Sequence, residues 1–176
     1  IFFGGRFMSQ MPKSNVMKDE FGWEVPVESV PLPSRGLIYD PDTLLHNTEM
    51  LNIKAMTARE EDILSSQAYI KQGIVIEKLI ESWVIDKSIN VSDLITGDKN
   101  ALMVAIRITG YGSNYLVEHK CRNCGSLNKV NIDLSSLPIK RIIHDPLELG
   151  KNLFAFTLPV TNKVVNYRIP TGKDEK

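Results

Sequence analysis

The stretch Ile74-Val-Ile-Glu-Lys-Leu-Ile-Glu-Ser-Trp-Val-Ile85 carries the clearest structural signal in the chain. Its apolar residues recur at the spacing that places side chains on one broad face of an α-helix. The run is short and is interrupted by Glu77, Lys78 and Glu81, so it does not have the length or composition of a membrane span. We therefore expect an amphipathic helix at the centre of a hydrophobic core, with Trp83 as a packed core aromatic.

The segments on either side of this stretch also predict helices. Upstream, Thr57-Ala-Arg-Glu60 has the spacing of a capping box, in which the Glu60 carboxylate reaches back to the start of a helix that runs to about Ile70. Downstream, residues 99–109 place apolar side chains on one side of a third helix. Two glycines, Gly110 and Gly112, are expected to end it.

The chain before residue 50 is rich in proline. Five of the nine prolines lie between Met11 and Asp42, so no long helix fits there. Residues 25–39 alternate apolar and polar positions and then turn at Ser34-Arg35-Gly36. An edge strand or a strap across the core is the favoured interpretation. A segment that adds to a neighbour's sheet or groove is the alternative.

Beyond residue 112 the pattern changes to short strands. The expected strands, with one more before the helices, cover residues 50–55, 114–118, 127–134, 153–158 and 164–169. Helices come first and most strands later, so we predict an α+β fold. We divide it into an N-terminal extended arm (1–49), a helical lobe (50–112) and a β-rich lobe (113–176) with a zinc-ribbon-like knuckle.

The charges of the 176 residues cancel in sum but not in distribution. Lys and Arg number 21, as do Asp and Glu, and a formal charge of zero argues against a general nucleic-acid coat or an anionic-membrane binder. Residues 1–119 carry 11 basic and 16 acidic side chains, a balance of −5, whereas residues 120–176 carry 10 and 5, a balance of +5. This predicts either two lobes that attract each other or a subunit that docks oppositely charged neighbours at its two ends.

One motif carries chemistry. His119-Lys-Cys121-Arg-Asn-Cys124-Gly125, between two expected strands, is similar to half of a zinc ribbon, because two intervening residues let both sulfurs reach one tetrahedral ion. The remaining two ligands would be His119 and His144, or would come from another subunit. A metal-free hairpin is the favoured interpretation, and structural zinc at these four residues is the alternative. Two cysteines make no disulfide scaffold, which indicates a reducing compartment.

Other functions for this motif stay open. Lys120, Arg122 and Lys129 surround it and fit a zinc-ribbon module that binds nucleic acid, although interleaved aromatics for base stacking are missing. A thiol redox enzyme is a third hypothesis, but a redox CxxC usually opens a helix, and here a strand follows. The sequence has no HExxH, phosphate-cradling glycine loop or GxSxG motif. We expect no enzyme activity and no cofactor other than the candidate zinc.

Six short motifs follow one another along the chain. They are Val-Pro-Leu-Pro-Ser-Arg-Gly-Leu-Ile-Tyr (30–39), Met-Thr-Ala-Arg-Glu-Glu-Asp-Ile-Leu (56–64), Leu-Ile-Thr-Gly-Asp-Lys-Asn-Ala-Leu (94–102), Ile-Arg-Ile-Thr-Gly-Tyr-Gly (106–112), Cys-Arg-Asn-Cys-Gly (121–125) and Ile-Asp-Leu (132–134). Their order resembles the T4-type bacteriophage baseplate protein family, whose members are hub subunits or hub-assembly proteins of contractile tails. The resemblance covers residues 28–175.

The resemblance implies a non-enzymatic role in building the central hub of a phage tail baseplate. The implied partners are other tail and baseplate proteins or further copies of the chain. The composition predicts no membrane partner, and nucleic acid is a partner only under the alternative hypothesis of a zinc-ribbon module. The implied location is the cytoplasm of the infected bacterium during assembly, or the tail baseplate of the virion. No catalytic residues follow from it.

Residues 167–176 repeat the pattern of residues 53–62. In both, a threonine is followed by a basic residue at the second position and by acids at the third and fourth. The first copy predicts a helix start, and the second stops where its helix would begin. We therefore expect the natural chain to continue past Lys176 into another helix.

Overall fold

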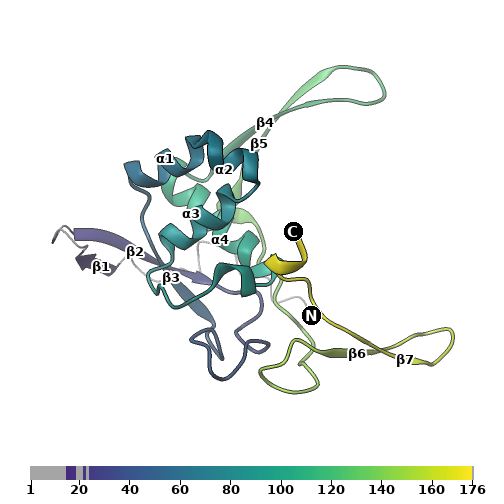
Figure 1. Cartoon of the computed structure of the whole chain (residues 1–176). Coiled ribbons are helices and arrows are strands. Elements are labelled where there is room, and N and C mark those ends of the chain that lie inside the picture. The colour runs from purple at the N-terminus through teal and green to yellow at the C-terminus, as the bar shows by residue number, and fades with distance from the viewer. Residues whose placement is uncertain (1–14, 19–21, 23, 176) are drawn as a thin grey trace.

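The computed structural model of the chain describes residues 15–18, 22 and 24–175, so the first 14 residues of the expected arm lie outside this part. The fold is α+β, as the sequence predicts (Figure 1). Its α-helices within the described residues are α1 (Ala58–Ser65), α2 (Gln67–Gln72), α3 (Val75–Trp83) and α4 (Thr96–Tyr111). Its strands there are β1 (Asn15–Lys18), β2 (Glu24–Pro31), β3 (Met50–Lys54), β4 (Asn114–Lys120), β5 (Leu127–Asp133), β6 (Phe154–Thr157) and β7 (Val164–Tyr167). Short 3-10 turns η2 (Val91–Asp93), η3 (Leu134–Ser136) and η4 (Gly172–Glu175) complete the elements of this part.

The core forms around α3, as its apolar spacing predicts. Leu79, Ile80 and Trp83 on this helix are buried, and Trp83 is a packed core aromatic. Helix α3 contacts α1, α2 and α4, and α4 in turn contacts β2. The side of α4 that faces the core contributes Leu102, Ala105 and other small or branched residues, which permits close packing of the two longest helices.

The proline-rich segment is a strap across this core. Strand β2 pairs antiparallel with β1 on one side and with β3 on the other, with Val30 opposite Leu51. Val30 and Leu32 are fully buried, so the prediction of a strap across the core is confirmed. The prediction of an edge strand is wrong, because β2 is hydrogen-bonded to a strand on each side and is the central strand of its sheet. After Pro31 the chain turns at Gly36, whose φ of +72° lies in the left-handed region that favours glycine. Gly36 also lies so close to the turn at residues 45–48 that an added Cβ would be 2.2 Å from Thr48 N.

Two helix boundaries differ from the prediction. The helix expected to run to Ile70 is interrupted at Ser66, whose extended backbone separates α1 from α2. Serines favour such breaks because their hydroxyls compete for backbone groups, and Ser65 Oγ donates to Asp62 O at 3.2 Å. Helix α4 is longer than expected and passes through Gly110, where the missing side chain makes room for Met56: a Cβ there would lie 2.8 Å from its sulfur.

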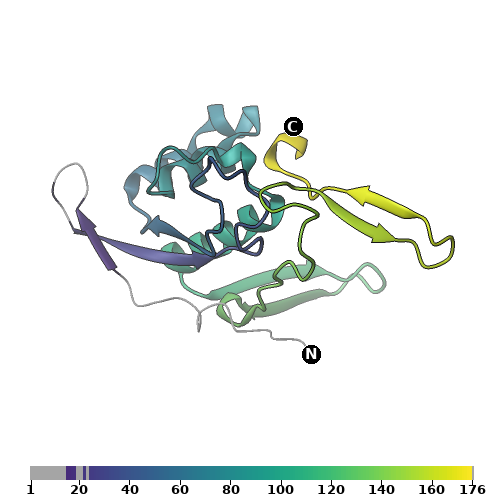
Figure 2. The ribbon, with the colours of Figure 1, turned by 90° about the horizontal axis from the view of Figure 1, so that it is seen from below.

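Beyond α4 the chain forms two hairpins that project from the core. Strand β4 pairs with β5, and β6 pairs with β7, each as a separate two-stranded antiparallel sheet. Both hairpins extend away from the helices (Figures 1 and 2), and Figure 1 shows that they diverge from each other. Leu134, just after β5, and Phe154, at the start of β6, are buried in the same hydrophobic cluster as α3, so the hairpins are rooted in one core.

The buried cluster draws on each of the three segments that the sequence suggests, with Leu32, Ile80 and Phe154 as examples. The boundaries at residues 49 and 112 stay a prediction. In the described part of the chain no helix combines the length and the apolar composition needed to cross a membrane.

Candidate functional site

A buried polar network joins two of the sequence motifs. Asp98, at the start of α4, has no exposed surface and accepts hydrogen bonds from Ser34 N (2.9 Å), Ser34 Oγ (2.6 Å) and Tyr39 Oη (2.5 Å). The Tyr39 hydroxyl also accepts from Ile95 N at 3.1 Å. Burial raises the pKa of Asp98, and the donors from Ser34 and Tyr39 act against that rise. The network fixes the strap to α4 and has a structural role.

A second buried carboxylate fixes α1 to its neighbours. Glu60 has no exposed surface, accepts from Thr57 N at 2.8 Å and from the hydroxyls of Thr57 and Ser82, and pairs with Lys54 Nζ at 3.1 Å. The predicted capping box is therefore present. Burial alone would raise the pKa of Glu60, but the hydrogen bonds from Ser82, Thr57 and Lys54 outweigh it and lower the pKa to about 2.

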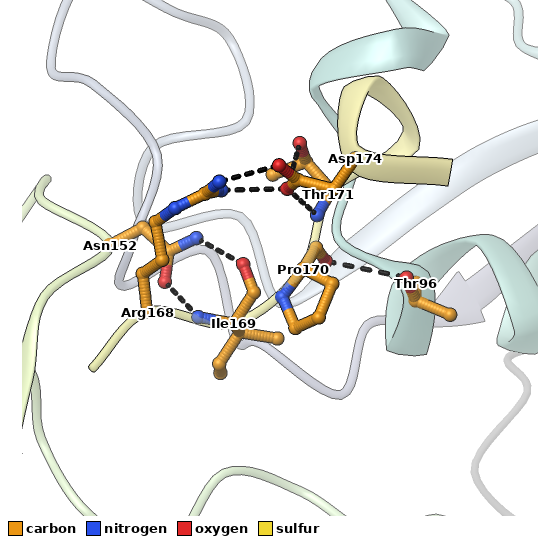
Figure 3. A network of polar contacts seen from close by, with 7 residues as sticks. All are labelled: Thr96, Asn152, Arg168, Ile169, Pro170, Thr171 and Asp174. Carbon is orange, nitrogen blue, oxygen red and sulfur yellow. Dashed lines mark hydrogen bonds and ion pairs between the residues drawn. The ribbon is translucent and has the colours of Figure 1, made fainter. Parts of the chain in front are cut away.

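The predicted repeat of this capping pattern is found at the base of the β6–β7 hairpin. Thr171 N donates to Asp174 Oδ2 at 2.9 Å (Figure 3). Thr57 N donates to the Glu60 carboxylate in the same way. Arg168 also donates to both carboxylate oxygens of Asp174, which together with the bond from Thr171 N lowers the pKa of Asp174. The repeated sequence pattern thus corresponds to a repeated local geometry.

Further contacts at this base attach the hairpin to the core. Asn152 forms two hydrogen bonds with the backbone of Ile169, accepting from its N at 2.9 Å and donating to its O at 2.7 Å (Figure 3). Thr96 N, at the start of α4, donates to Pro170 O at 3.0 Å. The rings of Phe154 and Tyr167 stack with their centroids 5.4 Å apart. The hairpin therefore leaves the core in a defined direction.

Beyond its base the β6–β7 hairpin presents apolar side chains to solvent. The strand register places Phe156 opposite Val165, on the same face as the stacked Phe154 and Tyr167. Phe156 is 51% exposed and Val165 is 38% exposed. An apolar row thus begins in the core and continues outward, where the described protein does not cover it. This row of exposed apolar residues is a candidate interaction site.

The β4–β5 hairpin has the same character. Its register puts Tyr115, Val117, Val130 and Ile132 on one face, and Tyr115, Val130 and Ile132 are exposed there. At its base the Arg107 guanidinium lies over the Tyr115 ring, 5.7 Å from the centroid, and donates to Gly112 O at 2.9 Å. Both hairpins are thus anchored at the base and expose apolar residues along their length.

The cysteine motif lies at the tip of the β4–β5 hairpin. The last paired residues are Lys120 and Leu127, so residues 121–126 form the loop. Cys121 N donates to Ser126 O at 2.8 Å, and Cys124 Sγ lies 2.9 Å from Ser126 Oγ. Hydrogen bonds with Ser126 and with the Cys121 thiol lower the pKa of the Cys124 thiol to about 7.

The structure brings the two cysteines together but not the two histidines proposed beside them. In residues 15–18, 22 and 24–175 no group of three or more His, Cys, Asp or Glu side chains is arranged to hold a metal ion. His119 lies one pair below the loop, opposite Asn128, and His144 is exposed in the segment after β5. Zinc binding by Cys121 and Cys124 stays a prediction that needs ligands from elsewhere.

Sequence reasoning located the strands of both hairpins but did not predict that their apolar faces are exposed. The one sequence signal for such a face was the high density of apolar residues in short strands of the last third of the chain. Examples are Phe154-Ala-Phe156 and Val164-Val165, in which no polar residue separates the apolar ones. That pattern equally fits strands buried in the protein's own core.

Comparison with known proteins adds an independent finding. The family model described as T4 bacteriophage base plate protein matches residues 39–149, which is more than half of the chain. Searches of curated proteins and of solved structures returned no match. The matched range includes α1 to α4 and the whole β4–β5 hairpin with its cysteine loop. The chain therefore belongs to the T4 bacteriophage base plate protein family and is a structural protein of a phage baseplate.

Proposed function

We propose that the chain is a hub subunit or hub-assembly protein of a phage tail baseplate, and that it acts through protein contacts and not as an enzyme. The observation that carries this proposal is the pair of anchored hairpins with exposed apolar faces. Its partners are other tail and baseplate proteins. It works in the cytoplasm of the infected bacterium during assembly and within the tail baseplate of the virion.

Anchored hairpins suit this role for a physical reason. A preformed hairpin loses little conformational entropy when it binds, so more of the free energy of apolar burial appears as affinity. The outer edges of both two-stranded sheets are unpaired within the described residues, and a neighbouring strand can extend either sheet. The negative balance of residues 1–119 and the positive balance of residues 120–176 favour an ordered orientation among neighbours.

The β6–β7 hairpin offers a matched pair of variants for testing the proposal. Val165→Lys places a charge on the apolar face beside Phe156, whereas Val164→Lys places the same charge on the opposite face, beside Thr157. Both positions are exposed, so neither change should alter folding. Losing the burial of one large apolar side chain, about 1.5 kcal/mol or more, weakens binding about tenfold.

The assay has two arms. In one, each variant is supplied to a phage that lacks the gene, and complete tails are counted by electron microscopy. In the other, the purified variants are titrated with individually purified proteins of the same tail. We expect V165K to lower tail yield and affinity and V164K to leave them near the wild type. Complete tails in the absence of the gene, together with no binding to any tail protein, would refute the proposal.

A zinc-ribbon module that binds nucleic acid is the second candidate function. It is favoured by Lys120 and Arg122, which are exposed at the tip of the β4–β5 hairpin. Lys129 pairs with Glu118 at 2.7 Å, which leaves it less available to a phosphate. Titration of fluorescent single-stranded and double-stranded DNA and RNA at several salt concentrations separates the candidates. Phosphate contacts predict an affinity that falls steeply with salt, and absence of binding at low salt removes this candidate.

A further inference from the structure

The cysteine loop at the tip of the β4–β5 hairpin places two potential metal ligands side by side, and no third His, Cys, Asp or Glu of the described residues lies with them. Cys121 and Cys124 are free thiols in contact with each other, and the loop that holds them is closed by hydrogen bonds from Cys121 N to Ser126 O and from Gly125 N to Cys121 O. Gly125 has φ +73°, the left-handed conformation that this tight turn requires. The hairpin carries the loop away from the helices (Figure 1).

Two thiolates satisfy half of a tetrahedral zinc ion, which in structural sites takes four sulfur or nitrogen ligands. No third His, Cys, Asp or Glu of the described residues joins them. A second copy of the chain supplies the missing pair most directly. A two-fold axis through the ion would bring the same two sulfurs from the second tip, which gives the four-cysteine set common in structural zinc sites.

We propose that Cys121 and Cys124 of two copies of this chain bind one zinc ion between their hairpin tips and so join the copies into a dimer. The inference concerns self-association and does not depend on the proposed baseplate role. Zinc binding here is ligand exchange without oxidation: each thiol loses its proton to solvent, and the four thiolates donate electron pairs to Zn²⁺.

The charges around the loop fit this arrangement. One Zn²⁺ with four thiolates carries a net charge of −2, and Lys120 and Arg122, which flank Cys121, are exposed at each tip. Two tips therefore place four cations around the site, which lowers the cost of its negative charge. Without the metal the same four cations repel one another, so the tips do not associate. Zinc thus controls whether the copies join.

Geometry also permits two tips to approach. The residues that precede and follow the loop in this two-stranded hairpin are exposed on both strands. They are Glu118 to Lys120 and Leu127 to Lys129. The helical core is set back from the tip (Figures 1 and 2). A contact between two loops therefore does not require the cores to collide.

The test uses the full chain, reduced with a phosphine, stripped with a chelator and then titrated with zinc chloride. Mass is followed by light scattering coupled to size exclusion, and bound metal by elemental analysis. We expect a monomer of 19.8 kDa without zinc and a mass twice as large with one zinc per two chains. Cobalt(II) in place of zinc should give the visible absorption of a tetrahedral tetrathiolate site.

Variants locate the ligands. Cys121→Ser and Cys124→Ser should each abolish the zinc-dependent dimer, while His119→Ala and His144→Ala should leave it intact. Circular dichroism checks that the serine variants are folded, which we expect because the loop lies outside the core. One zinc per monomer, loss of the dimer in either histidine variant, a dimer that persists without zinc or in the serine variants, or no zinc binding would each overturn the proposal.

Discussion

Glu60→Gln is the sharpest test of how the core is held together. The wild-type carboxylate is fully buried and receives donors from Thr57, Ser82 and Lys54, which lower its pKa from an ordinary 4.5 to about 2. Since one pKa unit corresponds to about 1.4 kcal/mol, the native surroundings favour the charged form by about 3 kcal/mol. Glutamine keeps the shape of the Glu60 side chain but places an NH₂ group against one set of hydrogen-bond donors. We therefore expect E60Q to lower the free energy of unfolding by about 3 kcal/mol at pH 7.

The pH dependence of the free energy of unfolding distinguishes the loss of the buried Glu60 charge from a packing defect. A carboxyl whose pKa is lowered on folding contributes its full stability above pH 4.5 and loses it as the pH falls towards 2. The difference in the free energy of unfolding between wild type and E60Q should therefore be constant from pH 7 to about pH 5. It should shrink steadily below pH 5, because only the wild type has this carboxylate to protonate.

Urea denaturation followed by circular dichroism measures both quantities, at pH 7 and at intervals down to pH 3. Glu61→Gln is the matched control, because Glu61 is the exposed neighbour in the same first turn of α1 and its change should cost less than about 0.5 kcal/mol. The reasoning is refuted if E60Q unfolds at the same urea concentration as the wild type. It is equally refuted if the difference in stability between the two proteins does not change below pH 4.5.

Three further changes test other contacts by the same denaturation assay. Tyr39→Phe removes a hydrogen-bond donor from buried Asp98 and should lower the free energy of unfolding by about 2 kcal/mol. Unchanged stability would show that this hydrogen bond does not stabilise the fold. Gly36→Ala should cost more than about 3 kcal/mol because of its φ of +72° and a backbone clash at 2.2 Å, whereas Gly73→Ala, with a similar φ and open space, should cost about 1 kcal/mol. Equal losses would show that the clash relaxes freely. Trp83→Ala should cost about 3 to 5 kcal/mol, and a smaller loss would mean that the site collapses around it.

Local patterns in the sequence predicted local structure well. The apolar spacing of residues 74–85 predicted α3 and its buried Trp83, and the threonine-to-acid spacing predicted the capping box at Glu60. Both signals arise within a few residues of the chain. The break at Ser66 was missed because hydrophobic spacing continues across it and no proline or glycine marks it.

Contacts between distant residues were beyond local reasoning. Asp98 meets Ser34 across 64 positions of sequence, and its own neighbours suggested only a helix start. The exposure of the hairpins was missed for a related reason. Alternation along a strand shows that one face is apolar, but not whether that face is covered by the same chain or by another protein. The same limit applies to Cys121 and Cys124, whose spacing indicates a shared ion but says nothing of the remaining ligands.

The burial of Phe154 has a consequence for the order of events during synthesis. This residue is the last of the buried cluster whose first member is Val30, so the core lacks one of its buried aromatic side chains until synthesis has passed residue 154. The β4–β5 hairpin, by contrast, needs only neighbouring residues to pair. A chain truncated before residue 154 would lack both Phe154 and the β6–β7 hairpin, and it would expose apolar residues of the core to solvent. Formation of the β6–β7 hairpin therefore couples closure of the hydrophobic core by Phe154 to the presentation of the exposed apolar residues beyond it.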